Sequence, residues 1–142
     1  MNWLNDHDHL ILDASYSRDF NKVLSGLPWT VNSVRWTTLP HRELEIPDDP
    51  LDDNFWEAFK ASPIGGHDFT FLMYSGREPG FACRTHDAVP DLDLLYSGAP
   101  GSRYFCGVDM GSEGPVLNFK DFAEYDGNGV IKMSMPPGCA SP

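Results

Sequence analysis

The chain has 142 residues, with 21 Asp and Glu against 10 Lys and Arg, which gives a formal net charge of −11 at pH 7. An anionic surface of this size repels nucleic-acid phosphates and anionic membranes, so the charge argues against both as ligands and favours a positively charged partner. Apolar residues make up 41% of the chain and aromatic residues 13%, which is enough for one folded domain and excludes a disordered acidic tail.

The N-terminus carries neither a basic segment nor an apolar run, so we read no secretory signal in it. No stretch approaches the roughly 20 apolar residues that span a bilayer. We therefore expect a cytoplasmic protein in which Cys83, Cys106 and Cys139 are reduced thiols. The sequence leaves open whether Cys83 and Cys106 are neighbours.

The first half of the chain predicts three strands and a helix. Residues 9–14 form a short apolar run that favours a strand. Ser17 suits the N-cap of a helix over about 17–25, because apolar side chains then recur along one face. Residues 30–38 and 43–46 alternate between apolar and polar side chains, and the short connection between them predicts a hairpin.

A second helix is predicted over about 50–61. Asp49 suits the N-cap and Pro50 the first helical position. Phe55 and Phe59 then fall on one apolar stripe, with Trp56 beside it.

The second half alternates with the period of β-structure. The sequence Asp126-Gly127-Asn128-Gly129 indicates a hairpin turn, because Gly and Asn tolerate positive φ. We expect one α+β domain over 1–136, a mostly antiparallel sheet of about six to eight strands with two short helices, and a flexible tail at 137–142. The strands predicted in this half are 68–74, 81–86, 92–96, 103–108, 116–125 and 130–135.

Two groups of residues invite a catalytic interpretation. Cys83 and His86 have the residue types of a nucleophile and its base, and Cys106 is the other thiol that His86 might use. On a strand, residues three apart point to opposite faces, so Cys83 would need a bend after Arg84 to meet His86. His7 and His9 have metal-ligand chemistry but no evident third or fourth ligand, so we predict no metal and no cofactor.

The remaining feature is a surface. We call the carboxylates between 43 and 57, together with Trp56, the acidic surface. Aromatic side chains within a charged rim are typical of tight protein interfaces, and Trp36 is a second candidate for the aromatic part. The competing interpretation is a solvated face whose carboxylates partly serve helix capping, with Trp56 in the core. The acidic surface comprises Glu43, Glu45, Asp48, Asp49, Asp52, Asp53, Trp56 and Glu57.

A small, acidic, single-domain chain without a catalytic signature resembles the immunity proteins of bacterial toxin systems. The resemblance implies a protein that neutralises a cationic toxin, commonly a nuclease or deaminase, by covering its active site. The acidic surface would then meet Arg and Lys in the toxin's cleft. The alternative is a small thiol- or metal-dependent enzyme that uses His86 with Cys83 or Cys106, or His7 and His9. Small acidic chaperones, phage-encoded inhibitors and structural components of larger assemblies also remain open.

Overall fold

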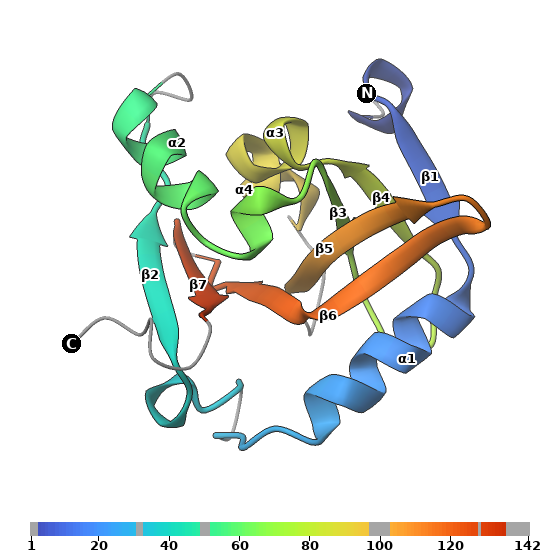
Figure 1. The fold of residues 1–142 in the computed structure, drawn as a ribbon, viewed down its shortest axis with the longest axis horizontal. Coiled ribbons are helices and arrows are strands. Elements are labelled where there is room, and N and C mark those ends of the chain that lie inside the picture. The colour runs from blue at the N-terminus through green and yellow to red at the C-terminus, as the bar shows by residue number, and fades with distance from the viewer. Residues whose placement is uncertain (1–2, 31–32, 49–51, 97–102, 128, 136–142) are drawn as a thin grey trace.

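The computed structural model describes residues 3–30, 33–48, 52–96, 103–127 and 129–135. These residues form a seven-stranded antiparallel sheet in the order β1-β4-β3-β5-β6-β7-β2 (Figure 1). The predicted α+β fold with a largely antiparallel sheet is confirmed. The strands are β1 (His9–Leu12), β2 (His41–Glu45), β3 (Phe69–Leu72), β4 (Gly80–Arg84), β5 (Tyr104–Gly111), β6 (Gly114–Tyr125) and β7 (Val130–Ser134).

Helices cover both faces of this sheet. On the face we call the α2 face, Leu72 and Phe105 pack beneath α2, α3 and α4. On the opposite α1 face, Phe71 packs with Phe20 of α1 and with Trp36 of the following segment. Within the described residues, no helix has the length and apolarity needed to cross a membrane. The helices are α1 (Ala14–Ser25), α2 (Asp53–Lys60), α3 (Thr85–Ala88) and α4 (Leu92–Leu95), with 3₁₀ turns at Trp3–Asp6, Trp36–Thr38, Ile64–Gly66 and Val89–Asp91.

Helix α1 begins earlier than predicted. Asp13, not Ser17, is the N-cap, and its carboxylate accepts hydrogen bonds from the hydroxyl and the backbone N–H of Ser15, the latter at 2.9 Å. These two bonds lower the pKa of Asp13. Ser17 lies buried within the helix instead, beside Phe20. The sequence did not separate Asp13 from Ser17, four residues later, because Ser and Asp are equally good caps.

Helix α2 is also capped by a different residue from the predicted one. Asp52 accepts the backbone N–H groups of Asn54 at 2.9 Å and Phe55 at 3.2 Å. Asp49, the predicted cap, lies outside the described residues. Phe55 and Phe59 are buried on the α2 face, as their stripe predicts.

The predicted hairpin of 30–38 with 43–46 is wrong. Strand β2 pairs instead with β7, where Glu43 lies opposite Lys132. The preceding segment crosses the α1 face, and Trp36 is 4% exposed in a 3₁₀ turn. Burial of the Trp36 indole in the tertiary structure therefore outweighs the local alternation of apolar and polar residues that predicted a strand.

Several predicted strands are shorter than expected, and one is absent. Strand β4 ends at Arg84 because α3 starts at Thr85, and residues 92–96 form the helical turn of α4 rather than a strand. Leu92 and Tyr96 are both buried. A short apolar run has no periodicity that separates helix from strand, which explains the error at 92–96. The hairpin predicted around residues 126–129 is confirmed, since β6 and β7 pair on either side of it. The predicted 137–142 tail lies outside the described residues.

A buried polar network attaches the Trp36 segment to the sheet. The indole N–H of Trp36 donates to Glu124 Oε1 at 2.7 Å. The backbone N–H of Val34 donates to the Tyr104 hydroxyl at 2.9 Å. Burial raises the pKa of Tyr104, so this phenol stays neutral. Buried polar groups of this kind stabilise a fold only while each retains its partner.

Trp36→Phe should lower the free energy of unfolding by about 1–3 kcal/mol, because Glu124 loses the indole donor in a buried site. Denaturant unfolding followed by circular dichroism measures the change. Glu124→Gln is the matched control, since its amide oxygen can still accept from Trp36, and it should cost less. An unchanged unfolding free energy in Trp36→Phe would contradict the role assigned to this bond.

Candidate protein-binding surface

The acidic surface is carried by β2, the connection after it, and α2. Asp52 is half-buried because it caps α2. Asp49 lies outside the described residues. The other carboxylates are open to solvent, namely Glu43, Glu45, Asp48, Asp53 and Glu57.

These exposed carboxylates do not form one flat patch. Leu44 of β2 packs into the core of the α2 face, so Glu43 and Glu45, on alternate positions, point to the α1 face. Asp53 and Glu57 belong to α2, which covers the α2 face. Figure 1 shows β2 as an edge strand leading directly toward α2. The acidic surface therefore wraps around this edge of the sheet.

Few of these carboxylates are neutralised within the chain. Among the described residues, the ion pair formed by this set is that of Glu43 with His41, whose Nε2 lies 4.0 Å from the carboxylate. The Arg84–Asp8 ion pair lies elsewhere, at the β1 side of the sheet. The exposed carboxylates are thus available to an external cation.

Trp56 lies half-buried at the edge of the α2 face. Its indole stacks on the His86 ring, with 4.8 Å between centroids, and meets Phe59 edge-on at 5.9 Å. The sequence offered two interpretations of Trp56, an anchor on an interface and a residue of the core. The ring matches neither fully, because it is partly packed and partly accessible. Trp36 is buried on the other face and takes no part in the acidic surface.

Two adjoining grooves meet at Asp48, and Trp56 lines one of them. One, of about 160 Å³, runs between Asp48, Trp56 and Asp91. The other, of about 330 Å³, continues past Asp48 to Asp93 and Tyr125. The grooves share one wall, which consists of Ile46, Pro47, Asp48 and Pro90.

Asp91 and Asp93 are components of the site that the sequence did not single out. Asp91 accepts from the indole N–H of Trp3 at 2.8 Å, and Asp93 accepts from the Tyr125 hydroxyl at 2.9 Å. Asp91 ends the 3₁₀ turn that contains Pro90, and Asp93 lies in α4, where the sequence predicted a strand. Pro90 was the available signal for a helical turn, because proline is favoured at the start of a helix.

The structure separates the residues of the thiol hypothesis. Thr70 of β3 lies opposite Cys83, and the next residue, Phe71, lies opposite Cys106, so the two thiols occupy opposite faces of the sheet. Burial raises the pKa of Cys83 to about 12, with the Asp87 carboxylate adding to the shift, and burial also raises the pKa of Cys106. A thiol in that state is a poor nucleophile. Cys139 lies outside the described residues.

His86, His7 and His9 each contact a neighbouring group rather than a thiol or a second metal ligand. The bend needed after Arg84 does occur, but it places the His86 ring against Trp56. The His7 ring stacks on Trp3 at 3.9 Å, and Nδ1 of His9 lies 3.0 Å from the carbonyl oxygen of His7. Within the described residues, no group of three His, Cys, Asp or Glu side chains is arranged to hold a metal ion.

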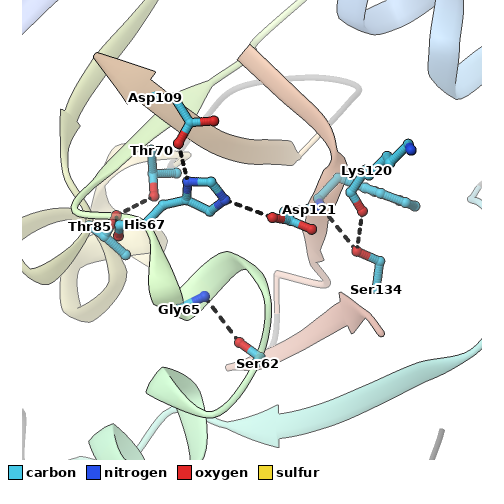
Figure 2. Close-up of polar contacts among 10 residues, drawn as sticks. Ser62, Gly65, His67, Thr70, Thr85, Asp109, Lys120, Asp121 and Ser134 are labelled. Carbon is cyan, nitrogen blue, oxygen red and sulfur yellow. Dashed lines mark hydrogen bonds and ion pairs between the residues drawn. The ribbon is translucent and has the colours of Figure 1, made fainter. Parts of the chain in front are cut away.

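A histidine bridged by two carboxylates is the other polar feature that sequence reasoning missed. His67 Nδ1 lies 3.1 Å from Asp109 of β5, and Nε2 lies 2.7 Å from Asp121 of β6 (Figure 2). The Thr85 hydroxyl donates to the His67 carbonyl at 2.8 Å. With both ring nitrogens occupied, His67 links three segments of the α2 face rather than presenting a free base.

A break in the β5–β6 register makes room for this ring. Cys106 pairs with Phe122, but the next residue, Gly107, pairs with Asn118, so residues 119–121 bulge from the ladder. The His67 ring lies directly over Gly107, where a Cβ atom would come within 2.3 Å of Cδ2. The position therefore requires glycine for close approach rather than for its φ angle.

Comparison with models of known protein families and with curated proteins found no match for this chain.

Gly107→Ala should lower the free energy of unfolding by about 1–3 kcal/mol, because the new methyl group displaces His67 from its two carboxylates. In a His67→Ala background the same substitution should cost much less, and thermal or denaturant unfolding of the wild type, the two single variants and the double variant measures this coupling. Gly66→Ala is the matched control, since a Cβ there meets no atom within 4 Å. Equal costs in the two backgrounds would contradict the contact.

Cys83 and Cys106 should not react with Ellman's reagent at pH 8 in the folded Cys139→Ser variant, because both thiols are buried and have raised pKa values. Both should react once the protein is unfolded in guanidinium chloride, which serves as the control. Fast reaction of either thiol in native buffer would return support to the thiol-enzyme hypothesis.

Proposed function

We propose that this chain is an acidic binding protein that neutralises a cationic protein partner. The observation that carries the proposal is the set of exposed carboxylates on β2, its following connection and α2. Within the described residues, none of them is paired with Lys or Arg. Binding a cationic partner therefore breaks no internal ion pair with Lys or Arg among the described residues.

The surroundings of these carboxylates suit a protein partner better than a free metal ion or small cation. Asp48 lines two grooves, and in the one that Trp56 also lines, an Arg or Lys side chain can meet a carboxylate while its stem lies against the indole. Aromatic residues concentrate the binding energy of protein interfaces, while exposed charges mainly speed and orient the encounter.

The most specific form of the proposal is an immunity protein. In this role the chain would act in the cytoplasm and occlude the active site of a cognate bacterial toxin of the nuclease or deaminase type. Nuclease clefts are lined with Lys and Arg that hold substrate phosphates. The acidic surface has the charge to take the place of those phosphates. The resemblance in size, charge and domain organisation supports this form.

Co-purification from the native host at low salt identifies the partner directly. We expect a basic protein that binds in a one-to-one ratio, and toxicity of that protein, when expressed alone, that co-expression of this chain relieves. A partner whose toxicity is unaffected by this chain would exclude the immunity role.

The triple variant Asp48→Asn, Asp53→Asn and Glu57→Gln should slow association with the partner by about tenfold or more at low salt. Stopped-flow kinetics over a salt series measures the effect, which should shrink as the salt concentration rises. Asp52 is left unchanged because it caps α2.

The matched control removes the same three charges from elsewhere. Asp19→Asn, Glu78→Gln and Glu113→Gln are all exposed and lie outside the acidic surface. This variant should associate nearly as fast as the wild type. Equal slowing by the two triple variants would mean that net charge alone, rather than the acidic surface, guides binding.

A further inference from the structure

The two edges of the sheet differ in chemistry. Strand β2 has the sequence His-Arg-Glu-Leu-Glu, with charged side chains along its free edge. Strand β1 has the sequence His-Leu-Ile-Leu, and Leu10 and Ile11 are 45% and 60% exposed. Figure 1 shows the two edges at opposite ends of the molecule.

An edge strand presents backbone N–H and C=O groups that can pair with another chain. Proteins usually protect such edges with charged residues, proline or a bulge. Strand β2 follows this rule, whereas β1 carries two adjacent large apolar side chains and no charged residue other than a histidine. The free edge of β1 is therefore suited to accept a further strand.

We propose that a second copy of this chain pairs with β1 in antiparallel fashion, which joins two sheets across a two-fold axis. With the axis at Ile11, each Ile11 faces its counterpart and each Leu10 faces the other chain's Leu12. The same register places each His9 opposite Asp13 of the other copy, and both of these side chains are exposed. This arrangement brings apolar side chains together at the axis and places an imidazole opposite a carboxylate.

The location of the acidic surface also favours this edge. Two chains that each carry a net charge of −11 repel one another. Because β1 and β2 are the two ends of the strand order, pairing through β1 keeps the acidic surfaces of the two copies at the far ends of the joined sheet. The remaining repulsion is screened over about 8 Å at physiological salt.

A groove extends the surface beside β1. It has a volume of about 170 Å³ and lies between Leu10, Phe69, Ala82 and Met110, with Met110 50% exposed, and Asp8, His9 and Arg84 complete its lining. Pairing at β1 brings the second copy next to this groove and covers apolar area there. A four-residue strand still buries less than the roughly 1,200 Å² of a stable interface, so the dimer is weak and reversible.

Sedimentation velocity of the full chain, from about 10 µM to about 1 mM protein, tests the proposal. We expect a monomer–dimer equilibrium that strengthens as NaCl rises from about 0.05 M to about 0.5 M, because salt screens the repulsion. Binding of a cationic partner weakens over the same range, so the two proposals succeed or fail separately. A monomer at every concentration and salt level overturns this inference and leaves β1 to a strand of another protein.

Ile11→Lys should raise the dimer dissociation constant by about tenfold or more, because two like charges then meet at the axis. Leu94→Lys is the matched control, since Leu94 is 52% exposed on α4, and it should dimerise as the wild type does. Thermal unfolding checks that both variants fold. A dimer that survives Ile11→Lys overturns the pairing through β1.

Disulfide crosslinking tests the pairing through β1 without introducing a charge at the axis. Ile11→Cys in a Cys139→Ser background should form an intermolecular disulfide on mild oxidation, because facing residues of antiparallel strands lie within disulfide distance. Leu94→Cys in the same background is the control and should remain largely monomeric. Equal crosslinking at the two positions contradicts the proposed axis.

Discussion

The burial of the central strands on both faces is the constraint on which the rest of this structure depends. Phe71 and Leu72 are consecutive residues of β3, both are fully buried, and they point into different cores. Every such pair needs cover above and below the sheet. Helix α1 and the Trp36 segment supply it on one face, and α2, α3 and α4 on the other. Among the described residues, the acidic surface accordingly lies on the outer side of one of these covers and at one edge.

The elements with strong local signals could be predicted from the sequence. The Gly-rich turn after Tyr125 defines its hairpin because positive φ is needed there, and Gly127 indeed has φ 85°. The Phe55–Phe59 stripe identifies α2 because the periodicity of an amphipathic helix is local. The exposure of most of the acidic surface also agrees with its composition, since isolated carboxylates are rarely buried without a partner.

Features that depend on distant contacts could not be predicted. The pairing of β2 with β7 joins segments far apart in the sequence, and so does the hydrogen bond between Trp36 and Glu124, whose residues are 88 positions apart. The placement of Asp91 and Asp93 beside Asp48 depends on how the α4 region packs, and the site of His67 depends on a register break between β5 and β6. None of these has a local pattern. The sequence therefore identified the acidic residues but not the grooves that some of them line.

The division of the carboxylates between the two sides of β2 has a consequence for the shape of any partner. Glu43 points to one side of this edge, and Glu57 lies on the helix that covers the other side. A flat surface can reach one side or the other, whereas a cleft with basic residues on both walls can reach the two at once. The β2 edge would then insert into such a cleft, and the width of the cleft would determine which cationic proteins can bind it.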